Sequence, residues 1–192
     1  GDEVVAPGQS LQPGQLYDSN SFTLDALLTG LGMHVIKKGI VDDSLTATQS
    51  ALETAAQEAD CIITTGGVSV GDEDYVRQAV ESLGQLALWK LAIKPGKPFS
   101  YGRVHDAPFF GLPGNPVAVF VTFVLLVRPY LLKMQGAVDL KLPKLSVKAG
   151  FDTASSNSRQ EFIRVRMNED AQGEQELEAY GNQGSSIMTS LS

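Results

Sequence analysis

The sequence has few of the residues that cross-link small proteins or bind zinc in them. Among its 192 residues there is one cysteine, Cys61, and two histidines, His34 and His105. A single thiol excludes an internal disulfide framework, and so little cysteine is typical of a reducing compartment, so we expect a cytoplasmic protein. The histidines are isolated and have no neighbouring cysteine, which argues against a zinc site. We interpret Cys61 as a buried strand residue without a redox role.

Long apolar runs and positive charge are also scarce. The longest apolar run, residues 117–127, is interrupted only by Thr122 and is too short to cross a bilayer, so it predicts a buried core helix. The net charge is −7, which makes non-specific nucleic-acid binding a poor hypothesis. No signal-peptide pattern is visible. We expect neither a membrane nor a nucleic-acid partner. Because the sequence opens Gly-Asp-Glu without methionine, we also expect further domains upstream.

Short apolar stretches alternate with segments of helical spacing over residues 1–139. We predict strands near 33–41, 61–65, 86–93, 99–104 and 109–112, and helices near 22–31, 45–56, 73–83 and 116–134. This alternation predicts right-handed βαβ units, and therefore a three-layer α/β domain built on a parallel sheet.

The pattern changes in residues 140–192, where no helical period is sustained. Short alternating stretches at 145–147, 162–166 and 177–180 are separated by turn-rich segments. About 50 residues can hardly build a large core of their own. We predict a small, barrel-like all-β domain that docks on the first domain.

A glycine-rich loop follows the predicted strand at 61–65 and leads into a helix. Its candidate ligand-binding residues are Gly66, Gly67, Ser69 and Gly71. Backbone N–H groups at such a turn, together with a helix N-terminus, suit a phosphate or a similar anion. The spacing matches neither the dinucleotide fingerprint nor the P-loop, and a tight turn that only glycine fits remains an alternative.

Acidic side chains crowd the same loop. Asp72 suits a helix N-cap, and Asp74 lies two residues further on. Asp43 follows the preceding predicted strand, and Glu3 would join it if the amino-terminal loop crosses the sheet edge. Carboxylates at neighbouring strand ends favour a hard cation that bridges to phosphate, although helix capping explains each acid singly.

Lysines and a second turn complete the candidate site. Lys90, Lys94 and Lys97 cluster around one stiff turn and favour an anion-binding patch, against the alternative of solvated surface lysines. The second turn is Pro113, Gly114, Asn115 and Pro116, which also reads as ordinary helix-start chemistry. Ligands of α/β sheets bind beyond the carboxyl ends of the strands, so we expect these groups to meet there.

Three ordered motifs resemble the molybdopterin molybdenumtransferase (MoeA) family. They are the stretches 65–75 (TGGVSVGDEDY), 90–98 (KLAIKPGKP) and 112–116 (LPGNP). The opening residues 1–3 and the stretch 17–20 are similar too. The resemblance covers residues 1 to about 136, and the predicted β domain is similar in position and size to the carboxy-terminal domain of the family.

The resemblance implies the last step of molybdenum cofactor synthesis. Adenylylated molybdopterin and molybdate would give molybdenum cofactor and AMP, with a divalent cation, usually Mg²⁺. Glu3, Asp43 and Asp74 match the functional acids of the family, and Lys90 and Lys94 match its functional lysines. Family members carry additional amino-terminal domains and form homodimers, and a molybdopterin adenylyltransferase is a partner that the pathway implies.

Two alternatives of other classes stay open. The α/β core also resembles molybdopterin adenylyltransferases and the CinA family, although the lysine turn and the β domain favour the transferase. A scaffold role is the second alternative, because the gephyrin E domain, a family member, also binds a receptor peptide.

Overall fold

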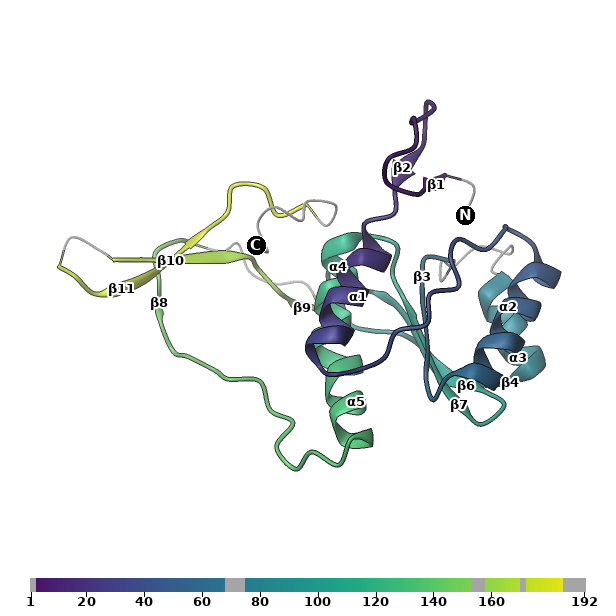
Figure 1. Cartoon of the computed structure of the whole chain (residues 1–192). Helices are drawn as coiled ribbons and strands as arrows, with labels where there is room; N and C mark the ends of the chain where they lie inside the picture. The colour runs from purple at the N-terminus through teal and green to yellow at the C-terminus, as the bar shows by residue number, and fades with distance from the viewer. Residues whose placement is uncertain (1–2, 68–74, 153–157, 170–171, 185–192) are drawn as a thin grey trace.

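The computed structural model describes residues 3–67, 75–152, 158–169 and 172–184 of the chain. Its centre is a four-stranded sheet in the order β3-β7-β6-β4 (Figure 1). The strands are β3 (Ile62–Thr65), β7 (Ala107–Leu112), β6 (Pro98–Val104) and β4 (Gly84–Lys90). The helices are α1 (Asn20–Gly30), α2 (Leu45–Glu58), α3 (Tyr75–Leu83), α4 (Pro116–Thr122) and α5 (Arg128–Met134).

Helices cover both faces of this sheet, so the predicted three-layer α/β architecture is confirmed. Successive side chains of β7 alternate between two cores, as a strand buried on both faces requires. Phe110 and Leu112 pack with Leu24 of α1 and Val119 of α4. Phe109 faces the opposite side, into the core that contains Leu52 and Val80 of α2 and α3.

The sheet is mixed, which corrects the prediction of a parallel sheet. Strands β3 and β7 are parallel, but β6 pairs antiparallel with both β7 and β4. The cause is a tight connection: β6 ends at Val104 and β7 begins at Ala107. His105 takes a φ of +49°, and Arg103 donates to the carbonyl of Asp106 across the turn. A two-residue loop can join only antiparallel strands.

The strand predicted at 33–41 is wrong. This segment forms no strand in the structure, although it is rich in valine and isoleucine, which favour strands. Met33 packs against the core, whereas Ile36 and Ile40 are exposed. A strand needs a neighbour for its backbone hydrogen bonds, and a β-favouring composition does not supply one.

Helix starts agree with the sequence chemistry. Ser44 caps α2 by accepting a hydrogen bond from the Ala47 backbone N–H at 3.2 Å. Asn115 occupies the N-cap of α4 with Pro116 in the first turn, but the Asn115 side chain makes no capping bond. The Asn115 side chain therefore contributes no cap, and the proline's fixed φ supports the helix start.

The helical stretch Pro116–Met134 has a mean hydropathy of 1.9, and within the described residues it alone has the length and apolarity to cross a membrane. Core packing accounts for this composition. Buried side chains recur every four residues along it, at Val119, Phe123, Val127 and Leu131. Its middle is a π-helical segment, η1 (Phe123–Val127). Because core helices of this kind pass the same test, the stretch is weak evidence for a membrane span.

The C-terminal part is all-β, as predicted, with different strand positions. Strands β10 (Val165–Glu169), β11 (Gln175–Ala179) and β8 (Lys148–Ala149) form one sheet. Strand β9 (Gln160–Glu161) instead pairs with β5 (Ile93–Lys94). The predicted strand at 86–93 is therefore divided into β4 and β5. A separate pair, β1 (Val4–Val5) with β2 (Leu16–Tyr17), precedes α1.

Cys61 lies just before β3 and packs against the core that contains Phe110. Burial, with a smaller contribution from Asp60, raises the pKa of its thiol to about 12. We expect the folded chain to resist alkylation at pH 8, where a thiol of pKa 12 is about 0.01% ionised. Unfolding in guanidinium should restore the labelling rate of a free thiol.

The same shift gives a pH dependence. Because the folded-state pKa lies above the unfolded value of ~8.5, the unfolded chain loses its proton first, and stability should fall as the pH rises from about 9 to 12. Denaturant titrations of the Cys61→Ala variant should lack this decrease. Equal slopes for the variant and the parent between those pH values would contradict the assignment.

Candidate functional site

The ends of four strands bring the predicted motifs to one edge of the sheet. Thr65 of β3 lies opposite Leu112 of β7, so the glycine loop and the turn 113–115 leave the sheet together. Antiparallel β6 begins at this edge, and Lys90, the last residue of β4, lies opposite Pro98, the first residue of β6. The edge predicted to carry the site therefore carries the described parts of all three motifs.

The first two turns touch directly. The Gly66 N–H donates to the carbonyl of Leu112 at 3.1 Å. A Cβ placed on Gly114 would lie 3.8 Å from the Cα of Gly66. The Asn20 side chain, at the start of α1, donates to the carbonyl of Gly114 at 2.7 Å. Three segments distant in sequence thus form one rim of backbone and amide groups.

Glycine is required at the first turn for two separable reasons. Gly66 and Gly67 both have positive φ, at +76° and +64°. A Cβ on Gly67 would also lie 2.7 Å from Val76 Cγ2, whereas one on Gly66 would meet nothing within 4 Å. Ser69 and Gly71 lie outside the described residues.

We predict that Gly67→Ala destabilises the chain more than Gly66→Ala does. Both variants force a side chain into the left-handed region, at ~1–2 kcal/mol, and only Gly67→Ala adds a clash with α3. Chemical denaturation of the two variants measures the difference. If both variants lose the same unfolding free energy, helix α3 moves aside without an energetic penalty.

The predicted acids are only partly described. Residues 59–61 join α2 to β3, so α2 runs back along the sheet and its N-terminus lies toward the site edge (Figure 1). Asp43 is exposed just before that N-terminus. Glu3 is exposed beside β1, and its carbonyl accepts from the Leu16 N–H at 2.8 Å. Asp74 lies outside the described residues.

A metal site is not formed by the described acids alone. Over the ranges that the structure describes, no group of three His, Cys, Asp or Glu side chains is placed to hold an ion. Hard cations need several oxygen ligands, so Asp43 and Glu3 do not by themselves fit Mg²⁺.

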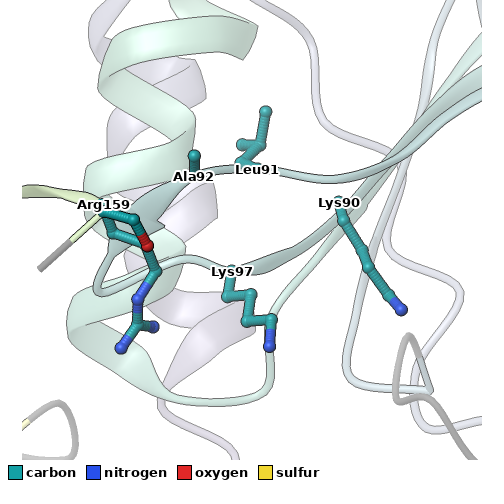
Figure 2. Close-up of a pocket in the computed structure, with 6 residues that line it drawn as sticks. Lys90, Leu91, Ala92, Lys97 and Arg159 are labelled. Carbon is teal, nitrogen blue, oxygen red and sulfur yellow. The ribbon is translucent and has the colours of Figure 1, made fainter.

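Two of the three predicted lysines share a pocket (Figure 2). This pocket is shallow and largely open to solvent, with a volume of about 590 Å³, and its described lining residues are Lys90, Leu91, Ala92, Lys97, Ser158 and Arg159. Figure 2 shows the Lys97 and Arg159 side chains extending to the same side of the backbone, with Lys90 on the adjoining strand. The described residues of the lining include three cationic side chains and no carboxylate, which suits an anion.

Lys94 is placed differently. Its ammonium group pairs with Glu161 at 2.7 Å across the β5–β9 pairing, and it does not line the pocket. The structure therefore gathers Lys90 and Lys97 and leaves Lys94 engaged with the C-terminal part.

Three residues of the edge escaped the sequence prediction. Arg159 enters the pocket from a turn-rich segment without a pattern. Asn20, in the resembling stretch 17–20, was expected only to help start a helix, and no binding role was predicted for it. Within the described residues, the Asn20 Oδ1 and Thr64 Oγ1 atoms are buried and have no hydrogen-bond partner. Buried polar atoms usually have one, so a polar group belongs beside them.

Comparison with known proteins gives the same family over the whole length. Residues 1–133 match the family described as a probable molybdopterin binding domain, and residues 146–192 match the MoeA C-terminal region (domain IV). The chain is 42% identical over 192 residues to a molybdopterin molybdenumtransferase of Haemophilus influenzae, covering 100% of this chain and 48% of that protein.

A second relative and a solved structure agree. A molybdopterin molybdenumtransferase of Nostoc is 40% identical over 168 residues, which are 85% of this chain and 38% of that protein. The crystal structure of a molybdopterin biosynthesis MoeA protein from Pyrococcus horikosii superposes with a TM-score of 0.78 at 31% identity, covering 98% of this chain and 44% of that chain. This chain spans about half the length of its relatives or less, and it belongs to the MoeA family of molybdopterin-binding proteins.

Proposed function

We propose that this chain forms the substrate-binding part of a molybdopterin molybdenumtransferase, which inserts molybdate into adenylylated molybdopterin and releases AMP. The observation that carries the proposal is the pocket with Lys90 and Lys97 at the sheet edge where the glycine turn and the turn 113–115 meet. Both substrates are anions, and the product AMP is also an anion.

The lysines would act as fixed positive charges in this reaction. Their ammonium groups would hold oxyanions of the substrates and oppose the negative charge on the departing AMP. The glycine turn would offer backbone N–H groups to a phosphate. The protein would thus contribute mainly by positioning the reactants, and the reacting groups would belong to the substrates.

The proposal includes a metal and further partners. Mg²⁺ would be held by Asp74, Asp43 and Glu3 and would polarise the pyrophosphate link. We also propose a homodimer at the relatives' full length, a molybdopterin adenylyltransferase as partner, and a cytoplasmic location. The proposed division is an α/β domain at 1–139 and a β domain at 140–192.

Exchange of one carboxylate tests the proposal. In a chain of the relatives' full length, Asp74→Ala should reduce molybdenum cofactor output to background, because a proposed metal ligand is lost. The matched control is Asp72→Ala in the same loop, where we expect a helix cap and a loss within about tenfold. Cofactor is measured by reconstitution of a molybdenum enzyme. Undiminished output from Asp74→Ala would refute the proposed metal role of Asp74, and a parent chain without output would defeat the proposed activity.

Binding measurements separate the transferase from a scaffold. Titration of AMP and molybdate in the presence of Mg²⁺ should give saturable heats for a transferase. A chain that binds neither anion would be a scaffold of the same fold.

A further inference from the structure

The pocket joins the two parts of the chain. Lys90, Leu91, Ala92 and Lys97 come from the α/β part, and Ser158 and Arg159 come from the C-terminal part. Arg159 directly precedes β9, the strand that pairs with β5. The position of its guanidinium therefore depends on how the C-terminal part docks.

The docking joint next to the pocket is small. Strands β5 and β9 pair over two residues. The Gln160 N–H donates to the carbonyl of Ala92, and the Phe162 N–H to that of Lys94, each at 2.8 Å. The Lys94–Glu161 ion pair adds to this, but both side chains are about half exposed. An exposed ion pair contributes little, so the joint by itself is weak.

Charge in the pocket works against this joint. Lys90 and Lys97 of the α/β part line the same pocket as Arg159 of the C-terminal part, and no acidic side chain is among the described residues of the lining. The like charges of these side chains repel one another across the joint. An anion with several oxygens that lies between them attracts each one, and this attraction outweighs the repulsion. Occupancy of the pocket and docking of the C-terminal part must then favour each other equally.

We infer that a tetrahedral oxyanion bound between Lys90, Lys97 and Arg159 fastens the C-terminal part onto the α/β part at the β5–β9 joint. The inference deepens the proposed function, since it uses the same pocket. It makes Arg159 a binding residue and the C-terminal part a ligand-dependent wall of the site. Two sources share this chemistry: free molybdate, and the phosphate of a nucleotide or pterin substrate.

Hydrogen exchange of the Gln160 and Phe162 amides measures the joint directly. In the 192-residue chain, at constant ionic strength with chloride as reference, molybdate or inorganic phosphate should slow exchange of these two amides about tenfold or more. Amides of β11, away from the pocket, should not change, which excludes a general salt effect. A larger effect of molybdate indicates free molybdate as the source, and a larger effect of phosphate indicates a substrate phosphate.

Variants assign the effect to Arg159. Arg159→Gln should abolish the anion-dependent slowing, and Arg159→Lys should retain part of it. The control is Arg77→Gln on α3, whose side chain pairs with Glu81 and does not line the pocket. The inference is overturned if neither anion slows the two amides, or if Arg159→Gln responds as the parent does.

The result is independent of catalysis. If anions slow exchange of the Gln160 and Phe162 amides but the full-length Asp74→Ala variant retains full cofactor output, the fastening is supported and the proposed metal role is refuted. If Arg159→Gln gives normal cofactor output and anions do not slow amide exchange in the parent, the proposed transferase activity stands and the fastening is refuted.

Discussion

Replacing Lys90 and Lys97 together by glutamine should weaken molybdate binding at least ~100-fold. Each ammonium offers a charge-assisted hydrogen bond, and we take ~1.5 kcal/mol for each because both side chains are exposed. The sum of ~3 kcal/mol corresponds to about two factors of ten. Isothermal titration of molybdate into the parent and the double variant measures the ratio.

The control for this variant removes the same charge elsewhere. Lys133 and Lys141 are exposed and lie outside the pocket, so their double replacement by glutamine lowers the net charge equally. It should change the affinity less than about threefold, through long-range electrostatics alone. If both double variants lose affinity equally, the pocket has no special role and overall charge governs binding.

Phe109→Ala should cost about 3–5 kcal/mol of unfolding free energy. Its ring is fully buried between the sheet and the α2–α3 layer, so truncation leaves a cavity as well as losing apolar burial. For a chain of this size the melting temperature should fall by roughly 6–20 °C. Thermal unfolding followed by circular dichroism measures it.

Phe22 gives the matched truncation on the surface. Its side chain is 55% exposed, and the Lys37 ammonium lies 5.3 Å from the centre of its ring. Phe22→Ala should therefore cost no more than about 1 kcal/mol. A loss for Phe109→Ala as small as that for Phe22→Ala would mean that this core collapses around the gap.

Local chemistry made the helix starts and most strands predictable. Ser44 and Pro116 mark their helices because capping and ring constraints act within a few residues. Strands β3, β6 and β7 follow compact apolar stretches that are buried on both faces. The family also followed from the sequence, because its motifs are short, ordered and continuous.

The predictions that failed concern the pairing of strands that are distant in the sequence. The antiparallel course of β6 could have been read from the two-residue connection at His105 and Asp106, which is too short for a parallel crossover. The segment 33–41 has a β-favouring composition but no strand partner.

The site residues also divide into those in local motifs, which were predicted, and those placed by distant strand pairing, which were not. Lys90, Lys97, Gly66 and Gly67 were predicted from motifs. Arg159 was not, because it reaches the pocket only through the pairing of β9 with β5. The roles of Asp74, Asp43 and Glu3 as metal ligands stay predictions.

The two-residue joint between β5 and β9 also has a consequence for synthesis on the ribosome. Roughly 65 residues separate the two strands in the chain, so at ~5–20 residues per second β5 emerges several seconds before its partner exists. During that interval its unpaired edge is open to a strand from a neighbouring nascent chain. Lys94 in β5 and Lys97 in the turn that follows would discourage such pairing, because their like charges on two chains repel each other.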